Sequence, residues 1–167
     1  MCTARFEVFA FGFMGAVRWG SSCSLICVPL DLIGKGVFAM KRYGVEGGKG
    51  TGGQHMPFSR AVEADGWLFV SGQTPMENGE VIEGGIVAQS HKAIQNVFAI
   101  LKEAGYGAEH VVRCGVWLDD PRDFASFNKV FREYFGENPP ARACVVSSMV
   151  IDCKVEVDCV AYKAAKG

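Results

Sequence analysis

Residues 110–136 read HVVRCGVWLDDPRDFASFNKVFREYFG, and their periodicity changes at Asp120. Before that residue, apolar and polar side chains alternate as in a half-buried β-strand. After it, aromatic and aliphatic residues recur at the spacing of an amphipathic helix that ends at Gly136. Asp120 offers an N-cap oxygen, and Pro121 suits the first turn of a helix. The stretch therefore predicts a strand followed directly by a helix whose aromatic stripe packs into a core.

The flanking residues add four strands and a second helix. The expected elements are a hairpin turning at Asp65-Gly66, an amphipathic helix and two C-terminal strands, at Phe58–Ala64, Trp67–Ser71, 86–104, Arg142–Ser148 and Cys153–Tyr162. The order ββαβαββ predicts a two-layer α+β domain, with one sheet that carries both helices on one face. The other face, which would hold Trp117 and Val160, is expected to pack against a second subunit.

Composition limits the classes of function. The chain has 167 residues, 49% of them hydrophobic, and its 17 basic and 18 acidic residues leave a net charge of −1. No positive field is available to hold a polyanion, so we expect no binding to nucleic acid. No charge-free run in residues 1–39 reaches the length of a membrane span, so we expect no membrane partner.

Seven cysteines and three histidines are scattered along the chain without paired metal-ligand spacing. A zinc site needs ligands clustered in pairs, so we expect no metal. An odd number of cysteines on apolar strands favours reduced, buried thiols, and hence a cytoplasmic protein, over a secreted disulfide framework.

The chain divides into three parts by composition. Residues 1–39 form an N-terminal extension. We interpret it either as a targeting segment or as an upstream extension of the reading frame, in which case Met40 would be the true start of the protein. Residues 40–55 are a Gly-rich linker or loop, with six glycines between positions 44 and 53. Those glycines do not match a phosphate-binding loop, because Pro57 follows where a helix should begin. Residues 56–163 form the compact domain.

Three motifs in that domain carry a resemblance to a known family. VSGQT at 70–74, PARACV at 140–145 and KVEV at 154–157 stand in the order and at nearly the spacings of the Rid (YjgF-like) reactive-intermediate deaminases. The resemblance implies a chorismate-mutase-like fold. It also implies a homotrimer, in which three sheets pack into a central barrel with ligand sites between neighbouring subunits.

The resemblance further implies hydrolysis of small enamine and imine acids, such as 2-aminoacrylate and 2-iminopropanoate, to 2-oxo acids and ammonia without a cofactor. The residue types suit this chemistry, because the planar guanidinium of Arg142 can grip a carboxylate and Glu156 can activate water. The expected catalytic residues are thus Arg142 and Glu156. Substrate-binding roles are expected for Ser71, Gly72, Phe58, Asn128 and, through its backbone N–H, Cys144.

Two departures from the family pattern bear on substrate range. Phe58 stands where many deaminating members have tyrosine, and SMVID at 148–152 replaces a turn that usually contains Leu-Pro. The substrate could therefore be a bulkier 2-imino acid or resemble aminomuconate. Two other functions stay open: a non-catalytic trimer that binds or senses small carboxylates, and an endoribonuclease, which the absence of a basic stripe disfavours.

Overall fold

The computed structural model describes residues 10–11, 14–17, 26–28, 40–44 and 57–164, in two compact units, Met1–Phe38 and Ala39–Gly167. In the first unit, three short strands, β1 (Ala10–Phe11), β2 (Met14–Val17) and β3 (Ile26–Val28), form an antiparallel sheet in that order. The second unit contains every residue expected to act on a substrate, and the following description concerns that unit.

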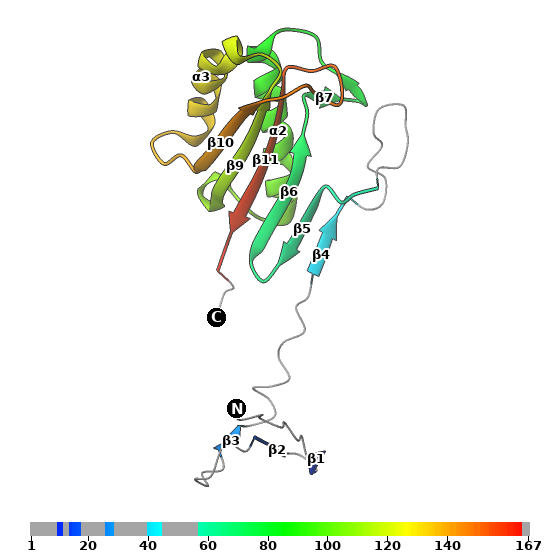
Figure 1. Cartoon of the computed structure of the whole chain (residues 1–167), viewed down its shortest axis with the longest axis vertical. Helices are drawn as coiled ribbons and strands as arrows, with labels where there is room; N and C mark the ends of the chain where they lie inside the picture. The colour runs from blue at the N-terminus through cyan, green and yellow to red at the C-terminus, as the bar shows by residue number, and fades with distance from the viewer. Residues whose placement is uncertain (1–9, 12–13, 18–25, 29–39, 45–56, 165–167) are drawn as a thin grey trace, which may run out of the picture. The chain divides into compact units, whose positions relative to one another are not determined.

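A six-stranded sheet is the centre of the second unit, with strand order β10-β9-β11-β6-β5-β4 (Figure 1). Its strands are β4 (Met40–Tyr43), β5 (Ala61–Ala64), β6 (Trp67–Gln73), β9 (Val111–Leu118), β10 (Ala141–Val146) and β11 (Val155–Tyr162). All neighbouring pairs are antiparallel except β9 and β10. That pair is parallel because helix α3 (Phe124–Phe135) connects its strands as a crossover.

Helix α2 (Ile86–Ala104) and α3 cover one face of this sheet (Figure 1). Alternation along β11 shows the two faces, since Val155 and Val157 are buried toward the helices while Glu156 between them is only half-buried. The helices complete the core with Ile94, Val97, Ile100, Leu101, Phe127 and Phe131. The predicted two-layer α+β fold is confirmed, and so is the turn at Asp65-Gly66, whose φ angles are 49° and 78°.

The sequence prediction was wrong at one connection. Residues 40–43, assigned to the Gly-rich linker, form strand β4, which pairs with β5 in the register Met40 to Ala64. Tyr43 alone in this strand is buried, and its hydroxyl donates a hydrogen bond of 2.5 Å to Glu63 Oε2. Between β6 and α2 the chain adds a small hairpin of β7 (Met76–Glu77) and β8 (Glu80–Val81).

Several strands also begin or end at other residues than predicted. Strand β5 begins at Ala61 rather than Phe58, β10 ends at Val146 and β11 begins at Val155. Asp120 does accept a hydrogen bond from the N–H of Arg122 (2.8 Å), but it caps a 3₁₀ turn that precedes α3. In β9, Arg113 pairs with Val160 and Val111 with Ala161, so Val112 bulges out, is 46% exposed and interrupts the predicted alternation.

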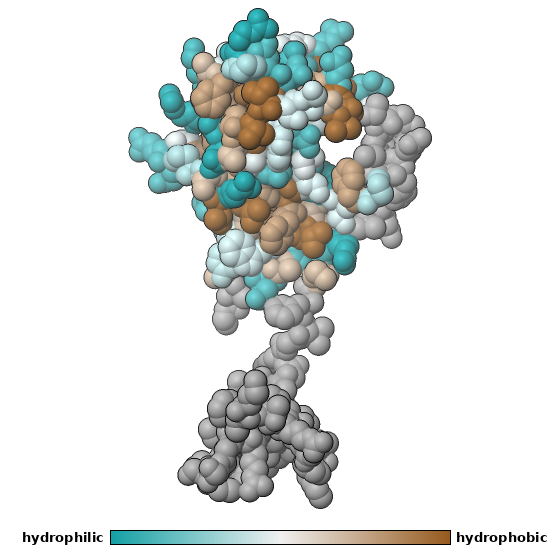
Figure 2. All heavy atoms as spheres, viewed as in Figure 1, coloured by the Kyte–Doolittle hydropathy of each residue, from teal (hydrophilic) through white to brown (hydrophobic). Residues whose placement is uncertain are grey.

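The second face of the sheet is uncovered in the single chain. Trp67 and Phe69 of β6 and Val145 of β10 are exposed there, and Figure 2 shows apolar side chains among polar ones on this side of the molecule. The prediction that another subunit covers this face stays a prediction.

Candidate functional site

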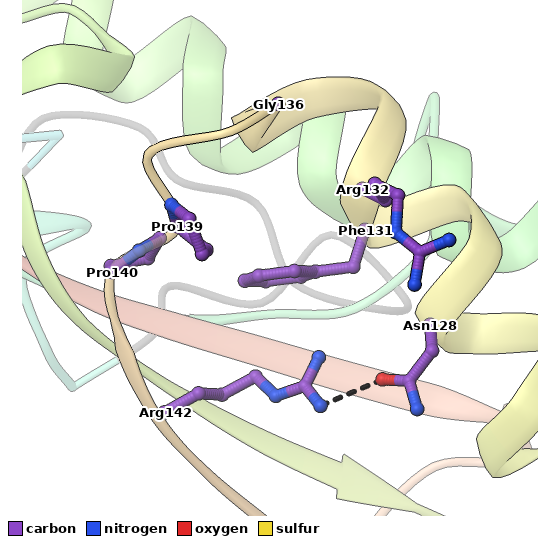
Figure 3. Close-up of a pocket in the computed structure, with 7 residues that line it drawn as sticks. All are labelled: Asn128, Phe131, Arg132, Gly136, Pro139, Pro140 and Arg142. Carbon is purple, nitrogen blue, oxygen red and sulfur yellow. Dashed lines mark hydrogen bonds between the residues drawn. The ribbon is translucent and has the colours of Figure 1, made fainter.

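Arg142 is the second residue of β10, and its side chain lies on the helix-bearing side of the sheet. It pairs in register with Cys114 of β9, which is fully buried beneath the helices. Its Nη2 donates a hydrogen bond of 2.7 Å to Asn128 Oδ1 on α3 (Figure 3). The guanidinium carbon lies 4.7 Å from the ring centre of Phe131. A hydrogen bond and a cation–π contact therefore hold the guanidinium group in one orientation.

A pocket of about 450 Å³ opens beside this guanidinium, between α3 and the loop that leads into β10. Helix α3 contributes Asn128 and Phe131 to the lining, and the loop and β10 contribute Pro139, Pro140 and Arg142 (Figure 3). Among the described residues, no carboxylate lies within ion-pairing distance of Arg142. The positive charge is therefore available to an anion that enters the pocket.

Cys144 presents its backbone at the edge of the sheet, because β10 is the outermost strand of the described sheet. Ser147 donates its N–H to the carbonyl of Leu118 on β9 (3.0 Å). In a β-strand the N–H groups of alternate residues point to the same side. Cys144 is three residues from Ser147, so its N–H points away from β9. The Cys144 thiol is partly buried, and this burial raises its pKa despite the nearby guanidinium. A raised pKa makes the thiol a poor nucleophile, whereas the free N–H can bind an anion.

Glu156 lies on the uncovered side of the sheet, in β11 between β9 and β6. It pairs with Trp117 of β9, and on its other side the carboxylate lies directly over Gly72 of β6, where a Cβ atom would overlap it. A side chain at position 72 would displace this carboxylate, so the glycine allows the carboxylate to lie there. Burial, and secondarily the charge of Asp158, raises the pKa of the Glu156 carboxyl above its ordinary value.

Phe58 lies in the segment that precedes β5, and Ser71 lies near the C-terminal end of β6. The register with β11 shifts there, since Val70 pairs with Cys159 but Gln73 with Val157, which leaves Ser71 and Gly72 in a bulge opposite Asp158. The Ser71 hydroxyl donates a hydrogen bond of 2.8 Å to the carbonyl of Ser59 and so fixes the segment that carries Phe58. Phe58 itself is 51% exposed.

The residues expected from the sequence therefore separate into two groups. The arginine group comprises Asn128, Arg142 and Cys144, and the glutamate group comprises Phe58, Ser71, Gly72 and Glu156. One chain does not bring the two groups together, because they lie on opposite faces of the sheet. The sequence interpretation also missed Phe131 and Arg132 as pocket residues. Their spacing of three and four residues from Asn128 on one helix could have indicated them.

Metal ligands do not gather in the described part of the chain, where no three His, Cys, Asp or Glu side chains are placed to hold an ion. His91 contacts the hydroxyl of Tyr134 at 2.9 Å, and His110 accepts a hydrogen bond from the N–H of Gly107. Neither of the two helices there is long and apolar enough to cross a membrane.

Known proteins resemble this chain over the compact domain. The family model described as Endoribonuclease L-PSP matches residues 53–163. A RutC family protein of Pyrococcus horikoshii is 42% identical over 110 residues, which are 64% of this chain and 87% of the relative.

Two solved structures share the fold. E. coli TdcF with bound serine has a TM-score of 0.64 and 28% identity, covering 74% of this chain and all of its own. RidA from the Antarctic bacterium Psychrobacter has a TM-score of 0.62 and 32% identity, covering 69% of this chain and 94% of its own.

Proposed function

This chain belongs to the endoribonuclease L-PSP family of YjgF/Rid-like proteins, as the sequence motifs predicted, and on that premise we propose that it is a cofactor-independent hydrolase of small 2-imino and enamine acids. The products are the 2-oxo acid and ammonia. Support comes foremost from one observation, the unpaired guanidinium of Arg142 held beside a pocket by Asn128 and Phe131.

The substrate carboxylate binds to Arg142. Asn128 occupies one donor of the guanidinium and leaves the others for a second, planar partner. The edge N–H of Cys144, two residues along the same strand, supplies a further donor. A carboxylate held by both would present the adjacent C=N carbon away from β10, in a fixed orientation that replaces random encounter with water.

Glu156 of a second copy of the chain acts on the water. Its raised pKa brings the carboxylate closer to the range in which a general base is effective at neutral pH. The water oxygen bonds to the imine carbon while its proton passes to Glu156, and the C=N electron pair moves to nitrogen. Glu156 delivers that proton to the nitrogen, which gives an amino alcohol. Glu156 then accepts the hydroxyl proton as the C=O bond forms and the C–N bond breaks, and it passes this second proton to the nitrogen, which leaves as ammonia.

A homotrimer is the assembly that we propose for this site. The uncovered sheet face carries the half-buried Glu156 among exposed apolar side chains such as Trp67 and Phe69, which favours a subunit interface on that side. Such an interface would let the glutamate group of one chain meet the arginine group of the next.

Turnover of imines formed in situ from L-alanine and L-leucine by an amino-acid oxidase tests the proposed activity. Wild type is expected to accelerate the release of 2-oxo acid and ammonia. Arg142→Lys and Glu156→Gln are each expected to lose most of that acceleration. For the lysine variant the reason is that a point charge lacks the two-pronged grip of arginine. Arg122→Lys, which alters an exposed arginine paired with Asp120, is the matched control. A wild type that binds the 2-oxo acid without accelerating hydrolysis would favour the non-catalytic binding function instead.

A further inference from the structure

The pocket beside Arg142 contains a second guanidinium group. Arg132 follows Asn128 by four residues on α3, so the two side chains lie on one face of the helix. Arg132 lines the same pocket as Arg142, and Figure 3 shows the two arginine side chains extending toward the space beside Asn128 from α3 and from β10.

Both of these charges are uncompensated. No aspartate or glutamate lines the pocket, and no carboxylate of the described residues pairs with Arg132. Arg60 pairs with Glu103 at 3.4 Å and Lys154 with Asp119 at 3.0 Å, whereas other described cations, such as Lys129, also have no carboxylate partner. Arg132 is therefore distinguished by its place in the pocket beside Arg142. Arg132 is exposed and Arg142 is partly buried, so a ligand that enters the pocket from solvent could bring negative charge to both.

The pocket is also large for a three-carbon acid. A volume of about 450 Å³ lies within the range of pockets that hold drug-sized ligands. Pro139 and Pro140 line the same pocket and offer apolar surface to a short carbon chain. The pocket therefore combines a site for one carboxylate, apolar surface for a spacer and a second cation.

We propose, building on the proposed function, that the preferred substrates are 2-imino acids whose side chain ends in a second carboxylate. The carboxylate next to the imine binds Arg142 and the N–H of Cys144, and the side-chain carboxylate binds Arg132. Arg132 is thus a specificity-determining residue that touches the part of the substrate remote from the reacting carbon.

The test compares 2-iminoglutarate with the imine of L-leucine, each formed in situ, on wild type, Arg132→Gln and Lys129→Gln. Lys129 is an exposed cation on the same helix outside the pocket, so its variant makes the same change in net charge. Arg132→Gln is expected to lower kcat/KM for 2-iminoglutarate about tenfold and to leave the leucine imine within about twofold. Lys129→Gln is expected to alter neither.

Calorimetric binding of the two products, 2-oxoglutarate and 2-oxo-4-methylpentanoate, provides a readout without turnover. If wild type hydrolyses neither imine but binds 2-oxoglutarate more tightly in a manner that depends on Arg132, the proposed function fails and the preference for two carboxylates stands. If wild type hydrolyses the leucine imine and Arg132→Gln changes both substrates equally, or changes neither, the proposed function stands and the role of Arg132 is overturned.

Discussion

Arg142 and Glu156 lie on opposite faces of the six-stranded sheet within one chain. Arg142 is in register with the buried Cys114 and bonds to α3, whereas Glu156 alternates with the buried Val155 and Val157 and faces the uncovered side. The sheet itself lies between the two side chains, so one small molecule cannot touch both in the same chain. Any reaction that uses both residues requires two copies.

Complementation between inactive variants tests this arrangement. Arg142→Ala and Glu156→Gln are each expected to be inactive, but unfolding and refolding them together should restore activity, because some sites then combine an intact Arg142 from one variant with an intact Glu156 from the other. Random mixing in equal amounts predicts recovery to about a quarter of wild-type activity. Each variant refolded alone is the control. Mixed oligomers that form, as judged by mass, yet show no activity would contradict a site shared between chains.

Local signals explain which parts of the fold the sequence predicted. Helix α2 has the expected bounds, 86–104, because its apolar stripe is long and Gly105 ends it in the left-handed conformation, with φ of 82°. Strand β4 escaped prediction because it has four residues, one buried, and depends on pairing with β5 and on the hydrogen bond between Tyr43 and Glu63. Neither interaction leaves a periodic pattern in the sequence.

The candidate site also has features that the sequence indicated and features that it did not. Motifs indicated Arg142, Asn128 and Glu156 as candidate site residues, which stays a prediction, but they did not indicate the face on which Arg142 lies. Strand β10 has no strict alternation of apolar and polar residues, since its sequence is ARACVV. Its facing is set by the parallel register with β9, which depends on the crossover through α3. The spacing of Arg132 from Asn128 could have placed the two side chains on one helix face, but the pocket itself depends on the path of the loop before Pro140.

Gly72→Ala is expected to damage activity more than stability. The added Cβ would overlap the carboxylate of Glu156, which must then swing away, and a displaced general base costs about tenfold or more in kcat. The free energy of unfolding should fall by no more than about 1 kcal/mol, because the displaced atoms are the end of a flexible side chain. Steady-state kinetics and thermal unfolding on the same preparation measure both effects.

Gly85→Ala is the matched control for that substitution, since a Cβ at Gly85 meets no atom within 4 Å and its φ is −88°. It should retain wild-type kinetics. If Gly72→Ala kept full kcat, the position of the Glu156 carboxylate over Gly72 would not matter to the reaction.

Glu156→Gln is expected to raise Tm at pH 7 and to lose that advantage near pH 4. Burial, followed by the charge of Asp158, raises the pKa of Glu156 in the folded state. The ionised carboxylate therefore destabilises the fold above the folded pKa, and this effect disappears as pH falls to the ordinary value of an unfolded glutamate. Thermal unfolding between pH 4 and pH 8 measures the difference between variant and wild type.

Asp120→Asn provides a contrast of opposite sign. Hydrogen bonds from Arg122 lower the pKa of Asp120 to about 2, so its ionised form stabilises the fold above the unfolded pKa and this stabilisation fades as pH falls toward 2. Asparagine keeps the capping oxygen but not the charge, and the group is exposed, so Tm at pH 7 should drop only slightly. A lower Tm for Glu156→Gln at pH 7 would show instead that the carboxylate makes a stabilising contact.

Asn128→Ala and Asn128→Asp are expected to separate the orientation of Arg142 from its charge. Alanine removes the acceptor of the 2.7 Å hydrogen bond from Arg142 Nη2, so the guanidinium retains its contact with Phe131 but gains freedom. Because hydrogen bonds to charged groups contribute about 1.5–3 kcal/mol, KM for an imino acid should rise about tenfold or more, with a smaller change in kcat. Aspartate restores the acceptor and strengthens the anchor, but it also neutralises the guanidinium, so Asn128→Asp should have the higher Tm of the two variants and the weaker binding of 2-oxo acid. Binding by Asn128→Asp as tight as wild type would contradict the assignment of Arg142 as the carboxylate anchor, since a guanidinium already paired with a carboxylate has little charge left for the substrate.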